Sequence, residues 1–291
     1  MTDAASTPFG DRLADAFARS GHLCVGIDPH EYLLKQWGLP LSAVGAHDFG
    51  LRVVNACIGR VGIVKPQVAF YEKFGSIGYR VLEDVLDEAR KAGLVVIADV
   101  KRGDLGSTIE AYGQAWLTPG SSLEADAMTI SAFQGFGALQ PPLELAQAAG
   151  KGLFVLSATS NPEAIAVQTA IIQRESQAGK TVAGGIASRV VNFNAEHSTG
   201  RLGSIGVVLG ATVDFDDVGI DLAELAVEPA APILAPGFGY QGAEFADVRR
   251  LFGVAADHTI VTASRSILEV GPDRLAAAIE AQAEELAKAY A

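Results

Sequence analysis

The chain alternates eight short apolar runs with longer amphipathic segments, and few folds accommodate that order. The runs are rich in Val, Ile, Leu and Ala, which is typical of strands that are buried on both faces. They cover residues 23–27, 62–65, 94–100, 127–130, 153–157, 205–209, 233–235 and 259–262. Strands that alternate with helices predict a parallel α/β sheet.

The segments between the runs have helical patterns, at 75–92, 135–149, 162–178, 215–226 and 272–290. In the first of these, Leu82, Val85, Leu86 and Ala89 recur at helical spacing and predict one buried face. Eight strand–helix units in 291 residues fit a (β/α)₈ TIM barrel better than an open doubly wound sheet. No Gly-x-Gly-x-x-Gly follows the first run, which weakens the dinucleotide-binding alternative.

Nothing in the chain divides it into parts, because it contains no internal repeat, low-complexity tract or linker. We therefore expect one catalytic barrel domain over residues 1–291. Two segments exceed the ideal repeat: 29–50 after the first strand, and 179–204 between the predicted fifth helix and the sixth strand, of which part is expected to be helical. Long insertions in compact folds are often functional. The second insertion and the loop after Gln241 are candidate lids.

Composition excludes several classes of partner. The net charge of −12 argues against nucleic acid and anionic membrane as general partners, since both require a positive field. A few basic groups can still form a local phosphate site. The N-terminal residues match no secretion signal and no apolar run is long enough to span a membrane, so we expect a cytoplasmic protein. Cys24 and Cys57 lie in apolar stretches and are expected to be buried free thiols.

The third apolar run ends in a cluster of charged residues, within the segment 95–108 (VVIADVKRGDLGST). Asp99 and Lys101 are two residues apart and point to one face if the strand continues to Lys101. Asp104 follows just beyond. Ionisable groups at the end of a buried strand are normally paired or used in chemistry. Carboxylates around a lysine keep it charged and aimed, although a lone Asp-x-Lys pair is more often solvated.

Polar residues also follow most of the other predicted strands. They are Asp28, Lys65, Gln67, Ser131, Ser157, Thr159, Ser160, Asn161, Gln241, Ser264 and Arg265. Taken singly, these residues also fit turns, solvated loops or helix starts. In a barrel the C-terminal ends of the strands form the active site, so together they predict one pocket. The glycine-rich loop 237–242 and the fork-shaped donor of Arg265 suit a phosphate group.

With these residues in place, the chain resembles the orotidine 5′-monophosphate decarboxylase family, in particular its longer bacterial form. The resemblance lies in the motifs GIDP at 26–29, VKPQVAFYE at 64–72, DVKRGDLGST at 99–108, TSNP at 159–162, PGFGYQG at 236–242 and SRS at 264–266. It implies decarboxylation of orotidine 5′-monophosphate to uridine 5′-monophosphate and CO₂, in de novo pyrimidine biosynthesis.

The resemblance also implies a homodimer with two composite sites. Lys65, Asp99 and Lys101 would come from one subunit, and Asp104 and Thr108 would reach in from the other. Lys101 would stabilise the carbanion that forms at C6 and then protonate it, because no π-system below C6 can absorb the electrons. Asp99 and Asp104 would keep this lysine protonated and aimed.

The resemblance assigns the remaining site residues to substrate binding and implies no metal, flavin or other cofactor. Asp28 and Lys65 would bind ribose hydroxyls, Ser160 or its neighbour Thr159 would face the pyrimidine, and Gln241 and Arg265, next to Ser264, would hold the phosphate. Tyr240 departs from the small residue expected in the phosphate loop, which leaves the contacts there open.

Two alternatives remain open at this point. The first is a related barrel enzyme, a sugar-phosphate decarboxylase or aldolase with a similar Asp-x-Lys-x-x-Asp strand. Such enzymes bind magnesium and are expected to have a carboxylate on strand two, where this chain has Lys65. The second is a non-catalytic protein that binds nucleotide phosphates. Simple binding does not require the charged array around Lys101, which argues against it.

Overall fold

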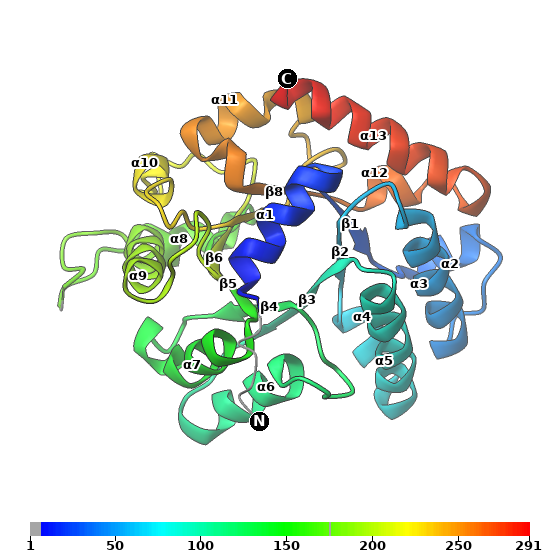
Figure 1. Cartoon of the computed structure of the whole chain (residues 1–291), viewed down its shortest axis with the longest axis horizontal. Coiled ribbons are helices and arrows are strands. Elements are labelled where there is room, and N and C mark those ends of the chain that lie inside the picture. The colour runs from blue at the N-terminus through cyan, green and yellow to red at the C-terminus, as the bar shows by residue number, and fades with distance from the viewer. Residues whose placement is uncertain (1–6, 175) are drawn as a thin grey trace.

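Eight parallel strands form a closed barrel with the strand order β1 to β8 (Figure 1), so the predicted fold class is confirmed. The computed structural model describes residues 7–174 and 176–291. The strands are β1 Leu23–Ile27, β2 Ile63–Pro66, β3 Val95–Arg102, β4 Ala127–Ser131, β5 Gly152–Ala158, β6 Ile205–Leu209, β7 Ile233–Ala235 and β8 Thr259–Ala263. Every predicted strand is present, because short β-branched runs have few other ways to bury both faces.

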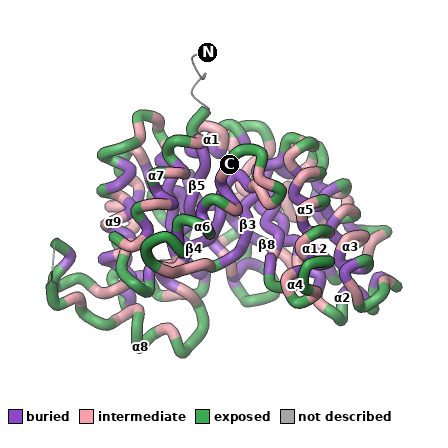
Figure 2. The backbone as a smooth tube through the Cα atoms, turned by 90° about the horizontal axis from the view of Figure 1, so that it is seen from below, coloured by how far each residue is buried: buried purple, intermediate pink, exposed green. Residues whose placement is uncertain are grey.

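The helices surround the barrel and cover the outer face of the strands (Figures 1 and 2). They are α1 Phe9–Ser20, α2 Glu31–Gln36, α3 Ala43–Cys57, α4 Ala69–Glu72, α5 Gly75–Lys91, α6 Gly106–Leu117, α7 Gln140–Ala149, α8 Ile165–Gln168, α9 Val182–His197, α10 Leu222–Leu225, α11 Val248–Phe252, α12 Arg265–Leu268 and α13 Leu275–Tyr290. Short 3₁₀ turns are η1 Phe136–Leu139, η2 Pro162–Ala164, η3 Phe245–Asp247, η4 Gly253–His258 and η5 Pro272–Arg274. In the described part of the chain, no helix is both long enough and apolar enough to cross a membrane.

Helix α1 closes the end of the barrel from which the strands start. Its apolar face, formed by Phe9, Leu13 and Ala16, packs against inward side chains such as Ile63 and Phe154. The rings of Phe9 and Phe154 meet edge to face, with centroids 5.9 Å apart. Figure 2 shows α1 at one end of the molecule and α2, α4 and α8 at the other. The interior is therefore sealed at the α1 end, and only the opposite end is available for a site.

The predicted helix at 162–178 is wrong for most of its length. Among the described residues of this range only η2 and α8 form, and neither buries a residue, so apolar side chains such as Ile165 and Val167 remain exposed. A helix that buries no face receives little stabilisation from packing, which limits it to a few residues.

The barrel helix between β5 and β6 is instead α9, within the segment that we expected to be an insertion, 179–204. Thr181 caps its first turn by accepting a hydrogen bond from Gly184 N, and Ser157 Oγ on β5 donates to Ala183 O. The additional segment therefore lies before α9, at 159–181.

Two further boundaries differ from expectation. The expected insertion at 29–50 contains α2 and the first half of α3, so the extra segment ends near residue 42. Of the predicted helix at 215–226 only α10 forms. Gly219 has a positive φ of 68° and Asp221 caps the chain two residues later, so the helix starts late. Cys24 and Cys57 are buried free thiols, as predicted.

Candidate active site

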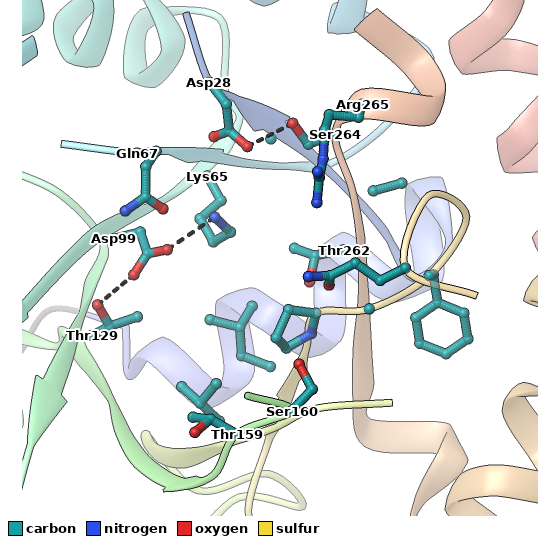
Figure 3. Close-up of a pocket in the computed structure, with 18 of the residues that line it drawn as sticks. Asp28, Lys65, Gln67, Asp99, Thr129, Thr159, Ser160, Thr262, Ser264 and Arg265 are labelled. Carbon is teal, nitrogen blue, oxygen red and sulfur yellow. Dashed lines mark hydrogen bonds and ion pairs between the residues drawn. The ribbon is translucent and has the colours of Figure 1, made fainter. Parts of the chain in front are cut away.

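Inward-facing residues at the C-terminal ends of the strands line a cavity of about 660 Å³ (Figure 3). Nine of the eleven predicted site residues lie in its wall: Asp28, Lys65, Asp99, Lys101, Thr159, Ser160, Gln241, Ser264 and Arg265. They come from loops and strands that are far apart in sequence. The closed barrel brings them together, because the ends of parallel strands meet at one face.

Asp99 connects the two lysines of this cavity. Its Oδ2 accepts a hydrogen bond from Lys65 Nζ at 3.1 Å, and its Oδ1 accepts one from Lys101 Nζ at 2.6 Å. Oδ1 also accepts a hydrogen bond from Thr129 Oγ1 at 2.8 Å. Charge-assisted hydrogen bonds of this kind are the strong ones, and three of them fix the carboxylate. The side chain of Asp99 is 8% exposed, whereas that of Lys101 is 47% exposed and extends into the cavity.

Both buried members of this array are held in their charged forms. Burial alone would raise the pKa of Asp99, but the ammonium groups of Lys65 and Lys101 outweigh it and hold the pKa far below its usual range. Burial alone would lower the pKa of Lys65, but the carboxylates of Asp99 and Asp28 raise it above its usual range. The cavity wall therefore contains a buried ammonium, Lys65, and a buried carboxylate, Asp99, that are both charged at neutral pH.

The backbone of Lys101 has a strained conformation, and its side chain points toward Asp99. Strand β3 continues to Arg102, but its register with β4 shifts between Ala98 and Arg102. Lys101 has a φ of 47°, the one positive value among the described residues other than glycine. Its backbone N donates to Thr129 Oγ1 at 2.9 Å. Strained non-glycine residues cluster at functional sites because the surrounding structure must hold them there.

Asp28 and Ser264 form a second polar group across the β1–β8 seam. Ser264 Oγ donates to Asp28 Oδ2 at 2.6 Å, while Asp28 Oδ1 has no hydrogen-bond partner in the described part of the chain. Gly26 permits this approach, because a Cβ there would lie 2.8 Å from the Ser264 Cβ. Asp28 therefore has one acceptor oxygen left for a ligand.

The loop after β7 and the start of α12 form the next part of the wall. Gly237, Gly239 and Gly242 all have positive φ, so the loop turns tightly and Gln241 borders the cavity. Arg265, at the start of α12, borders the cavity beside it. The side chain of Arg265 makes no hydrogen bond or ion pair with any described residue. A guanidinium with free in-plane donors suits an oxyanion such as phosphate.

The hydroxyl groups of Thr159 and Ser160, on the loop after β5, differ in their hydrogen bonds. The Thr159 hydroxyl donates to Asn161 Oδ1 at 2.8 Å and accepts from Gln168 Nε2 at 2.9 Å. The exposed hydroxyl of Ser160 has no such bonds with the described residues and borders the cavity. Ser160 is therefore the better placed of the two to contact a ligand.

Asp104 and Thr108 are the two predicted site residues that lie outside the cavity of their own chain. Asp104 Oδ1 accepts a hydrogen bond from Leu105 N at 2.9 Å, and Thr108 is exposed on α6. Leu105 is 61% exposed between them, and Phe133, on the loop after β4, is 83% exposed. Apolar side chains of this size on the surface often mark a contact with another molecule.

Thr129, which holds both the carboxylate and the backbone of the charged array, is not among the residues predicted from the sequence. Thr262, which lines the cavity on β8, is also not among them, whereas Gln67, just after β2, is predicted and does line the cavity. The strand period would have found Thr129 and Thr262. Thr129 is two residues after the inward-facing Ala127, and Thr262 is two residues before Ser264. Among the described residues, no group of three His, Cys, Asp or Glu side chains is arranged to hold a metal ion.

Comparison with known proteins places this architecture in a family. Residues 21–280 match the family model described as the orotidine 5′-phosphate decarboxylase / HUMPS family. The chain is 49% identical over 263 residues to the orotidine 5′-phosphate decarboxylase of a Nocardioides species, covering 90% of this chain and 92% of the relative. It is 46% identical to that of Salinispora arenicola, covering 96% and 95%.

Solved structures agree with the sequence relatives. A crystal structure from Streptomyces avermitilis, assigned as an orotidine 5′-phosphate decarboxylase, matches with a TM-score of 0.89 and 43% identity and covers 99% of this chain and 98% of its own. The OMP decarboxylase of Leishmania donovani matches with a TM-score of 0.73 and 27% identity, covering 98% and 100%. The matched residues include the whole barrel and the cavity, and the chain belongs to the orotidine 5′-phosphate decarboxylase / HUMPS family.

Proposed function

We propose that this chain converts orotidine 5′-monophosphate to uridine 5′-monophosphate and CO₂, with Lys101 as the catalytic residue. The observation that supports it most is the contact chain Lys65–Asp99–Lys101 in the wall of the cavity, in a chain whose relatives are orotidine 5′-phosphate decarboxylases. The reaction can be followed by the change in ultraviolet absorbance when purified protein is mixed with orotidine 5′-monophosphate. No absorbance change with folded protein would contradict the proposal.

The chemistry requires stabilisation of a localised carbanion. When the bond between C6 and the carboxylate breaks, its electron pair remains on C6 in the plane of the ring, where the π-system cannot take it up. The Lys101 ammonium, held in the cavity by Asp99, stabilises the negative charge at C6 and then donates a proton to it. The products are uridine 5′-monophosphate, CO₂ and a neutral lysine, which regains its proton from solvent.

Asp99 acts through both of its oxygens. By accepting from Lys65 and Lys101 it keeps the two ammonium groups in fixed positions, so that little reorganisation is needed as charge develops. Its own low pKa keeps it anionic at neutral pH. A carboxylate in this position also lies close to the substrate carboxylate, which disfavours the ground state relative to the product CO₂.

The other side chains of the cavity bind the rest of the nucleotide. The unpartnered oxygen of Asp28, together with Lys65, suits ribose hydroxyls, and the free hydroxyl of Ser160 suits the pyrimidine edge. Ser264, which orients Asp28, completes the ribose end. Gln241 and Arg265 receive the phosphate. The phosphate lies far from the bond that breaks. Its binding energy can still lower the activation barrier of decarboxylation if that energy closes loops over the substrate and excludes water.

We also propose that the working unit is a homodimer in which Asp104 and Thr108 enter the cavity of the partner. Their position outside their own cavity supports this, as do the exposed apolar side chains of Leu105, which follows Asp104 in the chain, and Phe133 on the loop after β4. A two-fold axis through this surface would carry each Asp104 toward the other chain's Lys101. The lysine would then lie between two carboxylates.

Arg265→Ala is expected to reduce kcat/KM severely for the nucleotide and far less for the phosphate-free nucleoside. The physical reason is that a guanidinium contributes through charge-assisted hydrogen bonds to the phosphate, which the nucleoside lacks. The measurement is kcat/KM of the wild type and of Arg265→Ala, each with orotidine 5′-monophosphate and with orotidine at the same ionic strength. Equal losses on the two substrates would show that Arg265 does not bind the phosphate.

Exhaustive chelation is expected to leave activity unchanged. A divalent cation requires oxygen ligands, and in this cavity the ammonium groups of Lys65 and Lys101 flank the only carboxylate on β3 that faces inward. The measurement compares turnover of orotidine 5′-monophosphate before and after dialysis against EDTA. Activity that disappears and returns with magnesium would move the chain to the sugar-phosphate branch of barrel enzymes.

A further inference from the structure

The ring of Tyr240, on the loop after β7, lies against the guanidinium of Arg265. The Arg265 Cζ is 3.7 Å from the ring centroid, well within the range of a cation–π contact. We propose that Tyr240 is a positioning residue, whose ring holds the Arg265 guanidinium over the cavity in readiness for the substrate phosphate. This inference rests on the proposed function, since it concerns how that site recognises the phosphate.

Arg265 differs from partly buried arginines elsewhere in the barrel in how it is held. Arg12, Arg90 and Arg102 each form an ion pair with a carboxylate. The Arg265 side chain has no hydrogen bond or ion pair with the described residues, and its guanidinium lies over the ring of Tyr240. A stack uses the face of the guanidinium and leaves its in-plane N–H groups free. Those are the groups that bind a phosphate side-on.

A competing partner for Arg265 lies close by. Glu269 follows it by four residues, and Glu269 N donates to Arg265 O at 3.0 Å. Its carboxylate accepts a hydrogen bond from Tyr32 OH at 2.9 Å. Burial and this hydrogen bond raise the pKa of Tyr32 to about 12, so it remains a donor. Without the ring of Tyr240, the guanidinium would be free to turn toward Glu269 and away from the phosphate position.

The backbone of the loop explains why Tyr240 reaches Arg265. Gly239, with a φ of 71°, packs so closely on the start of α12 that a Cβ there would lie 2.6 Å from Ser266 Oγ. This close approach places the next residue, Tyr240, beside Arg265. The Tyr240 side chain is 60% exposed, so it contributes little to the core. Its position is therefore better explained by the stack than by packing.

The test measures how strongly the protein distinguishes a nucleotide from a nucleoside. Dissociation constants for uridine 5′-monophosphate and for uridine are measured with wild type, Tyr240→Ala, Tyr240→Phe, Arg265→Ala and the double variant Arg265→Ala/Tyr240→Ala. The readout is the ratio of the uridine constant to the nucleotide constant. A cation–π contact of about 0.5–2 kcal/mol corresponds to about a 2- to 30-fold fall in that ratio for Tyr240→Ala.

Two comparisons separate the stack from a general effect on the loop. Tyr240→Phe retains the ring face, so its ratio is expected to remain within about twofold of wild type. Adding Tyr240→Ala to Arg265→Ala is expected to have no further effect, because the two residues act as one unit. An unchanged ratio in Tyr240→Ala, a loss in Tyr240→Phe as large as in Tyr240→Ala, or additive losses in the double variant would each overturn the inference.

Failure of the inference is distinguishable from failure of the proposed function. Turnover of orotidine 5′-monophosphate by the wild type tests the function without reference to Tyr240. A wild-type ratio near one would overturn the phosphate clamp, and with it the role of Tyr240, even in an active decarboxylase. Thermal unfolding of each variant verifies that all five proteins are folded.

Discussion

Lys101→Ala should lower kcat by more than about 10²–10⁴-fold, which is the range for loss of a general acid alone. The additional loss is expected because the same ammonium also stabilises the charge at C6. Binding of the product should change far less, since Asp28, Gln241 and Arg265 remain. The measurement is kcat by ultraviolet absorbance together with the dissociation constant of uridine 5′-monophosphate.

The matched control for this variant is Lys91→Ala. Lys91 is an exposed lysine on α5 that also pairs with an aspartate, Asp87, at 2.6 Å, but it lies outside the cavity. Exposed ion pairs contribute about 0–1 kcal/mol, so the control should keep both its fold and its kcat. If Lys101→Ala retains more than a tenth of wild-type kcat, the assignment of Lys101 as charge stabiliser and proton donor is wrong.

Mixing two inactive variants should restore activity if the site is shared between subunits. In a dimer with composite sites, Lys101→Ala and Asp104→Ala homodimers should both be nearly inactive. In their heterodimer, one site has both defects and the other has neither. Random pairing after unfolding and refolding an equal mixture yields about half heterodimers, and so roughly a quarter of wild-type activity.

This complementation separates the shared site from a site within one chain. Subunit exchange is verified by tagging one variant and isolating the mixed species. A verified heterodimer that is as inactive as its parents would mean that Asp104 acts on the Lys101 of its own chain. The positions of Asp104 and Thr108 outside the cavity would then require a movement of the 103–108 segment toward its own cavity.

The barrel could be predicted because the sequence pattern of each strand lies within a few consecutive residues. Short runs such as Ile205–Leu209 must be buried on both faces, and the alternation with helices leaves few parallel arrangements. The period of two predicted Asp99 and Lys101 on one face, and the two side chains do meet, although the register shift after Ala98 and the positive φ of Lys101 interrupt the regular strand. The same period extends to Thr129, which was missed because a single threonine in a buried strand has no charge to draw attention.

The wrong helices were those whose formation depends on tertiary contacts. The pattern at 162–178 has helical spacing, but its apolar side chains face solvent and the helix stops at Gln168. The segment 182–197, which we expected to belong to a partly helical insertion, has Ala183 and Val190 buried against the barrel and forms a full helix. The assembled barrel decides which of the two neighbouring segments packs on the strands. The helical period of a sequence does not show which segment that is.

Ser160 and Thr159 illustrate the same limit within the site. The sequence offered both hydroxyls to the pyrimidine. The choice between them depends on Gln168, which takes up the Thr159 hydroxyl from α8. The cation–π contact of Tyr240 with Arg265 likewise joins the loop after β7 to the start of α12, 25 positions later, and only their arrangement in space brings the two side chains together.

The most direct test of this account is the reaction in D₂O, followed by proton NMR of the product. The account predicts that orotidine 5′-monophosphate loses CO₂ and that the uridine 5′-monophosphate formed has deuterium at C6, because the exchangeable ammonium of Lys101 supplies the new hydrogen. Folded wild-type protein that releases no CO₂ from this substrate, or a product with protium at C6, would contradict it.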